Sequence, residues 1–174
     1  YISDPEMSLS DMLKIMPGPD FPTGGIIANK CDIPSIYETG TGKIRIRGKI
    51  ELEKGKTKRE HDKLIVSEIP YTMIGMGIGK FIQDVIDLIE NKTLPEVTDI
   101  SNQSSKDGFR IVMDLKPGYD FDRIVNVLYK KTKLEDTFGV NMLAIHNGRP
   151  YLFTLPMILK TWYEYQKELI TRKY

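Results

Sequence analysis

The spacing of apolar residues switches repeatedly between two periods along the chain, and this restricts the fold more than any other feature. Alternation of apolar and polar side chains is typical of half-buried strands, whereas apolar residues three and four apart form one face of a helix. The successive elements are expected at residues 63–69 (strand), 79–91 (helix), 97–101 (strand), 109–115 (strand), 121–128 (helix) and near 145 (strand). This is the split βαβ order, so we expect an α+β fold in which two helices cover one face of an antiparallel sheet.

A further alternating segment, KIRIRGKIELE at residues 43–53, separates charged from apolar side chains. The charged parity begins with four cations, Lys43, Arg45, Arg47 and Lys49. Because the polar run EKGKTKRE follows, we expect this strand and the strand at 63–69 to form a basic β-hairpin. Local signals also predict a short helix over 8–15, a hairpin around the Asn-Gly pair at 147–148, and a long C-terminal helix from 155.

The four cations allow two interpretations. Charge along a sheet edge prevents aggregation, which is a common use of lysine. Alternatively, the row binds a polyanion, because alternate strand residues lie roughly 6.8 Å apart, and the phosphates of one DNA strand advance about 3.4 Å each. Four phosphate contacts give a log–log salt slope of roughly −3.6. Charge alone leaves both interpretations open, since the chain as a whole has a net charge of only +1.

Residues with catalytic or metal-binding chemistry are few. Cys31 is the one cysteine, which excludes an internal disulfide and fits a reducing compartment. His61 and His146 have no evident nucleophile partner, so we expect them to be structural or solvent-facing. We therefore expect no catalytic and no metal-ligating residue here. The absence of any run of 18 apolar residues argues against a membrane span.

Two nucleotide-binding alternatives fit the sequence less well. GMGIGK at 75–80 lacks the spacing of a phosphate-binding loop, and Phe81 stands where a hydroxyl is required, so we expect a helix entrance. RNA-recognition domains share the split βαβ order but stack bases on aromatic residues of the central strands. Residues 63–69 contain no aromatic residue, and Phe109 lies on the parity expected to be buried.

The run GPDFPTGGII at 18–27 resembles the motif that leads into the tower region of type IIA DNA topoisomerase A subunits, the family that comprises the A subunits of DNA gyrase and topoisomerase IV. Other matches span essentially the whole chain in the family's order: YETGTGK at 37–43, Glu68-Ile69-Pro70-Tyr71, Lys106-Asp107-Gly108, Arg110-Ile111, Leu128-Tyr129, Phe138, Asn141-Met142, Asn147-Gly148, Pro150 and Thr171-Arg172. GMGIGK departs from the more polar sequence common in the family.

The resemblance implies a function. Such enzymes cut both strands of one duplex through paired tyrosines, pass another duplex through the gap and reseal it. ATP and Mg²⁺ act through the B subunit, so no cofactor is implied for these residues. The implied partners are double-stranded DNA, the B subunit and a second A subunit, in the cytoplasm and at the nucleoid, with no membrane. The four cations Lys43, Arg45, Arg47 and Lys49 become the predicted DNA-binding residues.

The resemblance also implies which parts of the enzyme are present. Residues 1–29 match the end of the cleavage core and a linker, 30–154 the tower, and 155–174 the start of the long helix toward the dimer gate. The family's nucleophilic tyrosine follows an arginine upstream of PDFPTGG, whereas no tyrosine here follows an arginine. Because the chain starts without methionine and stops within a predicted helix, we expect a piece of a longer protein, inactive alone and monomeric in dilute solution.

Two other functions remain as alternatives. The first is a purely structural spacer of the same enzyme, with little direct DNA contact. The second is a small anion-binding or nucleotide-binding protein that uses GMGIGK.

Overall fold

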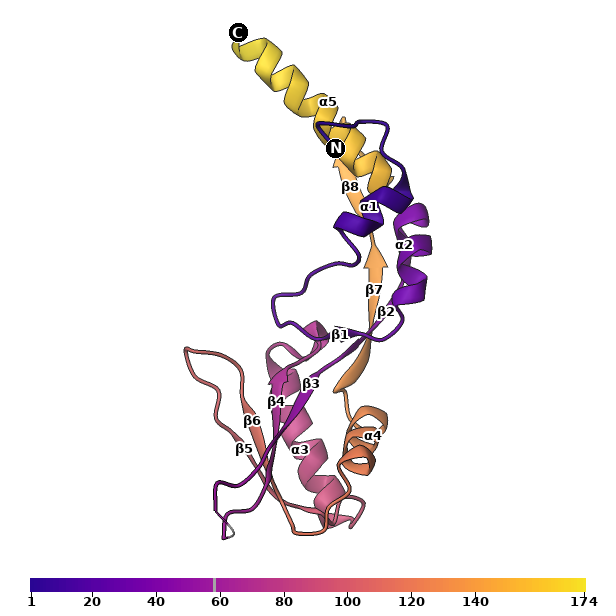
Figure 1. The fold of residues 1–174 in the computed structure, drawn as a ribbon. Helices are drawn as coiled ribbons and strands as arrows, with labels where there is room; N and C mark the ends of the chain where they lie inside the picture. The colour runs from indigo at the N-terminus through magenta and orange to yellow at the C-terminus, as the bar shows by residue number, and fades with distance from the viewer. Residues whose placement is uncertain (58) are drawn as a thin grey trace. The chain divides into compact units, whose positions relative to one another are not determined.

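The computed structural model describes residues 1–57 and 59–174 and is built from helices and antiparallel strands (Figure 1). The α-helices are α1 (Leu9–Ile15), α2 (Ile33–Thr39), α3 (Met76–Glu90), α4 (Phe121–Lys131) and α5 (Leu155–Lys173), and the 3-10 helices are η1 (Lys30–Asp32) and η2 (Tyr71–Met73). The strands are β1 (Ile26–Ile27), β2 (Thr41–Arg47), β3 (Lys49–Glu53), β4 (Lys63–Glu68), β5 (Val97–Asn102), β6 (Ile111–Leu115), β7 (Glu135–Asn141), β8 (Leu143–His146) and β9 (Arg149–Leu152). The predicted α+β class is confirmed. Lys58, in the predicted polar turn, lies outside the described residues.

The chain forms two compact units. The first unit consists of Tyr1–Pro19, Asn29–Ile44 and Phe138–Tyr174, and the second of Asp20–Ala28 and Arg45–Thr137. Strands β2 and β7 each contribute residues to both units. Among the described residues, no helix is long and apolar enough to cross a membrane.

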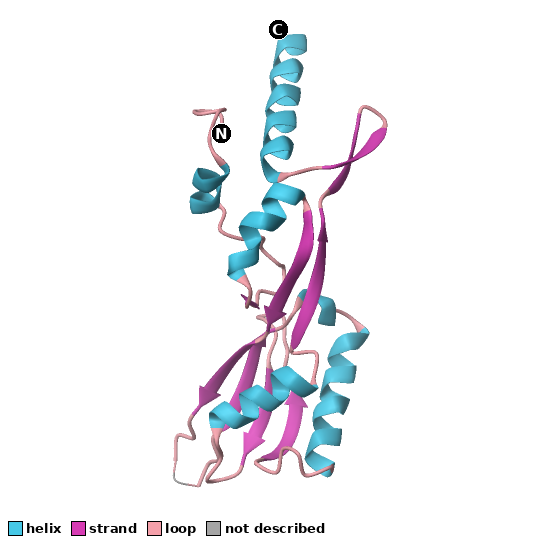
Figure 2. Ribbon diagram, turned by 90° about the vertical axis from the view of Figure 1, so that its right-hand side faces the viewer, coloured by secondary structure: helices cyan, strands magenta, loops and turns pink. Residues whose placement is uncertain are grey.

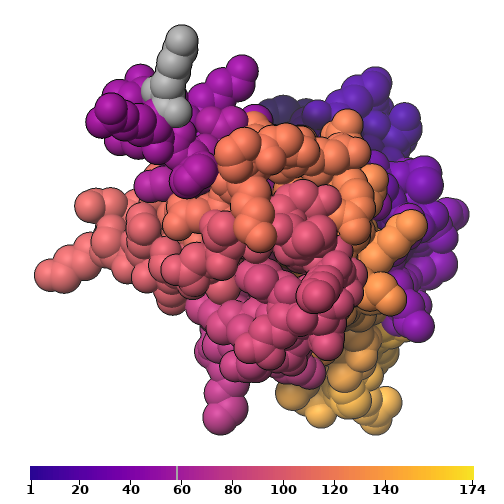
Figure 3. Space-filling view, turned by 90° about the horizontal axis from the view of Figure 1, so that it is seen from below, coloured from indigo at the N-terminus to yellow at the C-terminus, as the bar shows by residue number. Residues whose placement is uncertain are grey.

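The second unit contains a four-stranded antiparallel sheet in the order β3-β4-β6-β5. Helices α3 and α4 cover the same face of this sheet (Figure 2). The residues buried between helices and sheet are Leu64, Val66, Phe81, Val85, Ile111, Met113, Leu115, Ile124 and Leu128. Burying such a side chain stabilises a fold by about 1.5–3 kcal/mol, so this layer is the core of the unit. Seen from the end that carries the β3–β4 loop, the loop projects beyond the two helices (Figure 3).

Two details differ from the sequence prediction. Residues 43–53 are not one strand, because the chain changes sheet at Gly48: β2 lies between β1 and β7, while β3 pairs with β4. The strand expected near residue 145 is β8, which pairs with β9, and the strand that directly follows α4 is β7, which pairs with β2; neither joins the four-stranded sheet. The physical reason is that β3 already occupies the position beside β4, where the returning strand of a split βαβ unit would pair. The predicted β-hairpin is therefore formed by β3 and β4 alone.

The regular elements of the first unit are α1, η1, α2, α5, β8, β9 and its parts of β2 and β7. Ser8 caps α1 by accepting a hydrogen bond from the backbone N–H of Asp11 at 3.2 Å. Helix α2 ends at Gly40, whose φ of 76° favours glycine. A Cβ there would also lie 2.1 Å from the Phe153 carbonyl oxygen. The hairpin of β8 and β9 turns through Asn147 and Gly148, as the sequence predicts.

Candidate nucleic-acid interface

Strand β2 places its charged residues toward solvent, as the alternation predicts. Ile44 and Ile46 are buried, with 0% and 1% of their surface exposed. Lys43 and Arg45 are exposed and Arg47 is half-buried. Lys43 belongs to the first unit, whereas Arg45, Arg47 and Lys49 belong to the second. Burial of the isoleucines therefore fixes which way the cations of β2 face.

Glu135, at the start of β7, forms ion pairs with two of the predicted cations. Its Oε2 accepts a hydrogen bond from Nε of Arg47, and its Oε1 lies 3.9 Å from Nη1 of Arg45. One carboxylate thus offsets half of the charge of the two arginines, and the three groups together carry a net charge of +1. Both arginine side chains remain partly exposed, at 53% for Arg45 and 41% for Arg47.

Arg47 has a second contact that limits its freedom. Its guanidinium carbon lies 5.2 Å from the centre of the Tyr129 ring, within the range of a cation–π interaction. The Tyr129 hydroxyl donates a hydrogen bond of 2.8 Å to the carbonyl of Gly48. Burial raises the pKa of this tyrosine, an effect that Arg47 opposes and Glu135 reinforces. Arg47 is therefore part of a packed cluster that fixes the end of β2.

Gly48 marks the point where the chain leaves β2 and enters β3. Its N–H donates a 2.8 Å hydrogen bond to the carbonyl of Leu134. A Cβ at this position would lie 2.5 Å from Cδ1 of Leu134 and 2.8 Å from the backbone oxygen of Glu68. Only glycine fits this close approach without displacement of its neighbours, so the residue decides where the strand breaks.

Lys49, the fourth predicted cation, lies in β3 and forms an ion pair with a residue of the same strand. Its Nζ lies 3.1 Å from Oε1 of Glu51, two residues along the same face. The hydrogen bond and charge of Glu51 raise the pKa of Lys49, and the charge of Glu68 adds to this effect. The four cations thus do not form one uninterrupted row: three have carboxylate partners, and among the described residues no carboxylate is paired with Lys43.

The loop before β1 contacts the end of β4 and packs beside β2. The Gly25 N–H donates a 2.6 Å hydrogen bond to Oε2 of Glu68, and the rings of Phe21 and Tyr71 lie 6.2 Å apart. A Cβ on Gly25 would lie 2.9 Å from Cγ2 of Ile46, so the loop packs tightly on β2. Two of the sequence motifs, PDFPTGG and EIPY, therefore act as one structural unit that supports the basic strand.

Comparison with known proteins identifies the family. The family described as the A subunit of DNA gyrase/topoisomerase IV matches residues 1–174. The chain belongs to this family. The DNA gyrase A subunit of Chlamydia pneumoniae is 37% identical to it over 172 residues, which cover 99% of this chain and 20% of that protein. The corresponding protein of Clostridium acetobutylicum is 38% identical with the same coverage, and that of Streptococcus pneumoniae serotype 4 is 36% identical. The chain therefore spans about a fifth of the length of these relatives.

Within this member of the gyrase/topoisomerase IV A-subunit family, the sequence did not indicate the partners of the cations. Glu135 is separated from Arg47 by 88 positions, and no periodicity links the two. The sequence does single out Tyr129, because Leu128-Tyr129 is among the motifs that match the family. That signal marked the residue without indicating that its ring would lie under a guanidinium.

GMGIGK begins α3, as predicted for a helix entrance. Gly75 precedes the helix with a φ of 78° and provides no side-chain cap. Met76, the first helical residue, has 91% of its surface exposed. This helix entrance offers backbone N–H groups without a side-chain cap, which is the kind of helix entrance that the sequence predicts.

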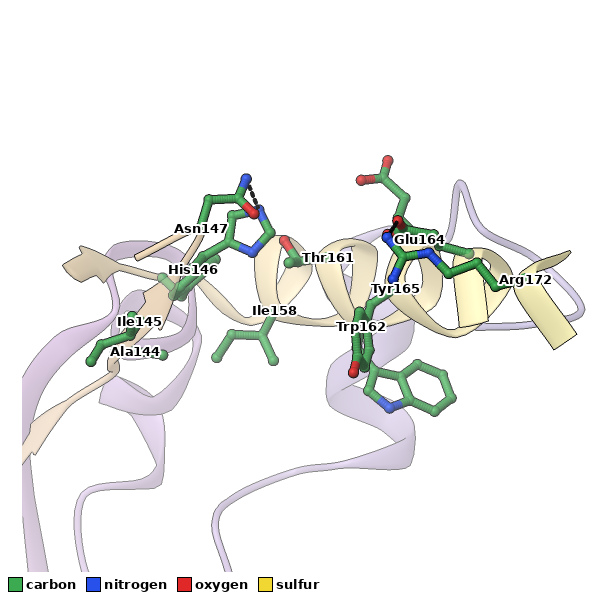
Figure 4. Close-up of a pocket in the computed structure, with 12 residues that line it drawn as sticks. Ala144, Ile145, His146, Asn147, Ile158, Thr161, Trp162, Glu164, Tyr165 and Arg172 are labelled. Carbon is green, nitrogen blue, oxygen red and sulfur yellow. Dashed lines mark hydrogen bonds and ion pairs between the residues drawn. The ribbon is translucent and has the colours of Figure 1, made fainter. Parts of the chain in front are cut away.

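An open groove of about 750 Å³ lies between the β8–β9 hairpin and α5 in the first unit (Figure 4). His146 and Asn147 lie at the hairpin end of the groove, with a separation of 3.3 Å between Nε2 and Nδ2. Trp162 and Tyr165 project from α5 at the other end, where Arg172 pairs with Glu168. Among the described residues, no group of three or more potential ligands is arranged to hold a metal ion. The expectation about cofactors stays a prediction.

Proposed function

We propose that this chain is the tower region of a type IIA topoisomerase A subunit, and that its basic strand binds the phosphate backbone of duplex DNA. The observation that carries the proposal is the direction of Lys43 and Arg45, which extend into solvent from a strand whose isoleucines are buried. Family membership supports DNA as the polyanion. The net charge that remains on Arg45, Arg47 and Glu135 is positive, so a phosphate is still attracted.

For the whole protein, we propose the chemistry implied by the resemblance. It is ATP-dependent cleavage, strand passage and resealing of DNA, with ATP and Mg²⁺ acting through a B subunit and with two A subunits per enzyme. The proposed location is the cytoplasm, at the nucleoid. Residues 1–29, 30–154 and 155–174 are assigned to the core and linker, the tower, and the helix toward the dimer gate. The chain alone is proposed to be inactive.

A structural spacer is the second candidate. It is favoured by the ion pairs of Arg45, Arg47 and Lys49 with carboxylates, and by the packing of Arg47 on Tyr129. If these contacts serve only the fold, charge on the strand contributes little to DNA binding. The two candidates differ in one measurable quantity, the salt dependence of duplex affinity.

The test is a triple variant, Lys43→Gln, Arg45→Gln and Lys49→Gln, which leaves Arg47 and its packing in place. Affinity for a fluorescent duplex is measured between about 50 and 200 mM salt. Loss of up to three phosphate contacts makes the log–log slope shallower by up to about 2.7. A matched control, with the exposed lysines Lys30, Lys106 and Lys160 all changed to glutamine, has the same net charge and should retain the wild-type slope. Equal slopes for the two triple variants would refute the DNA-binding strand and favour the spacer.

A further inference from the structure

The loop between β3 and β4 carries cations that differ from those of the strand. Lys54, Lys56 and Arg59 are exposed. Among the described residues, none of the ion pairs within 4 Å involves these three side chains. In the strand, by contrast, three of the four predicted cations are paired. Three exposed cations without an acidic partner within 4 Å in the described part of the chain thus lie close together at the tip of this hairpin, in the loop that projects in Figure 3.

The carboxylates of the loop have other partners. Glu53 pairs with Arg110 at 2.9 Å. Glu60 accepts a 2.9 Å hydrogen bond from the backbone N–H of Lys56. Asp62 accepts hydrogen bonds from the N–H of Gly55 at 2.9 Å and from the hydroxyl of Tyr119 at 2.5 Å. These acids therefore hold the loop in shape through donors other than the amino and guanidinium groups of the tip, and Lys54 acts on them only through its charge, which contributes to the lowered pKa of Asp62.

The tip also has a concave surface that is polar and charged. A groove of about 470 Å³ is lined by Lys54, Lys56 and Arg59, together with the acids Glu53 and Glu60. The groove is also lined by Lys63 and Asp114, which lie opposite each other in the register of β4 and β6. Because Lys63 has an acidic neighbour across the sheet, we assign the free positive charge to the other three cations.

The composition of the loop favours one class of partner. The fully buried core of a protein–protein interface is more apolar than the rest of the surface, and a single nucleic-acid strand gains affinity from stacking on aromatic rings. Residues 53–63 contain neither aliphatic side chains nor aromatic residues other than His61. The sugar–phosphate backbone of a duplex requires only cations and hydrogen-bond donors. A duplex is therefore the polyanion that this surface fits.

We infer that the tip of the β3–β4 hairpin is a second DNA contact, at which Lys54, Lys56 and Arg59 bind phosphates of the same duplex as the basic strand. This inference rests on the proposed function, because it takes the duplex from there. The inference adds three residues to the proposed DNA-binding surface. It assigns part of the attraction for DNA to the cations of the loop, which have no ion-pair partner among the described residues, in addition to the paired cations of the strand.

The experiment compares the whole chain with a tip variant, Lys54→Gln, Arg59→Gln and Lys56→Gln, by fluorescence anisotropy of a labelled duplex. The expected slope is about 2.7 shallower than that of wild type, so that a fourfold rise in salt weakens wild-type binding about 40-fold more than it weakens the variant. The control again changes Lys30, Lys106 and Lys160 to glutamine. Thermal unfolding of each variant verifies that the exposed substitutions leave the fold intact.

The outcomes separate this inference from the proposed function. If the wild-type chain binds the duplex and the tip variant has the same salt slope as the control variant, the tip contact is refuted. The DNA-binding role of the basic strand is tested separately, by the triple variant of Lys43, Arg45 and Lys49. If wild type does not bind a duplex at all, both fall. Polyglutamate is the competing probe: if it displaces the duplex at equal charge concentration, and does so only when the tip is intact, the surface selects acidic peptides and the assignment to DNA is overturned.

Discussion

Changing Glu135 to glutamine removes the carboxylate shared by Arg45 and Arg47 and keeps the size of the side chain. The net charge of the three groups rises from +1 to +2. If the strand binds DNA, this adds about one phosphate contact and makes the log–log salt slope steeper by about 0.9. A fourfold rise in salt, from about 50 to 200 mM, then weakens the variant about 3.5-fold more than wild type. At low salt the variant binds more tightly.

The change also has a cost in stability that can be bounded. The two ion pairs of Glu135 are partly exposed, and such pairs contribute about 0.2–1 kcal/mol each, so the free energy of unfolding falls by less than about 2 kcal/mol. The matched control is Glu96→Gln, which removes the partner of Arg123. The side chains of Glu96 and Glu135 are 18% and 21% exposed, and those of Arg123 and Arg47 are 44% and 41% exposed.

Fluorescence anisotropy with a labelled duplex measures the slopes, and urea unfolding measures stability. Glu96→Gln makes the same change of net charge at another place, so it should keep the wild-type slope. The reasoning is refuted if Glu135→Gln is folded and its slope equals that of Glu96→Gln, because the arginines it releases would then not meet phosphates.

Other predictions concern stability and assembly. Gly48→Ala should lower the free energy of unfolding by about 1–3 kcal/mol, because the added Cβ would overlap Leu134. Gly79→Ala should raise the free energy of unfolding by about 0.4–1 kcal/mol, because the added Cβ would meet no neighbouring atom within 4 Å. The hydrogen bond from Tyr119 is the main cause of the lowered pKa of Asp62. Because the folded state favours the ionised carboxylate, Asp62 stabilises the fold at pH values above its usual pKa near 3.8. This stabilisation is lost as the pH falls through the lower pKa of the folded state. Tyr119→Phe should therefore reduce the difference in unfolding midpoint between about pH 7 and about pH 3, and an unchanged difference would contradict this. Light scattering should give the mass of a monomer in dilute solution, and a dimer mass independent of concentration would contradict the expectation.

The elements fixed by local spacing could be predicted from the sequence. Helices α3 and α4, strands β4 and β6, and the Asn-Gly hairpin all lie where periodicity or turn chemistry places them. The change of sheet at Gly48 could not be predicted, because it depends on the close approach of Leu134, a residue distant in the sequence. A glycine within an alternating segment indicates a bulge or a close contact without indicating which strand approaches it.

The candidate site was predictable to a similar degree. Alternation with isoleucine correctly placed Lys43 and Arg45 on the exposed side of β2. It gave no information about Glu135, because ion pairs across 88 positions leave no periodic trace in a sequence. A count of positive charge along a strand is consequently an upper limit on the charge available to a ligand.

Residues of one parity also need not share one role. Lys43 and Arg45 project from β2, whereas the guanidinium of Arg47 lies over the ring of Tyr129, whose hydroxyl holds the carbonyl of Gly48. Reversing the charge of Arg47 would place a carboxylate beside Glu135 and break the cluster that fixes the crossing from β2 to β3. Weaker DNA binding by such a variant has two causes, a lost phosphate contact and a displaced strand. Only substitutions that spare Arg47 therefore separate the electrostatic contribution of the strand from its folding.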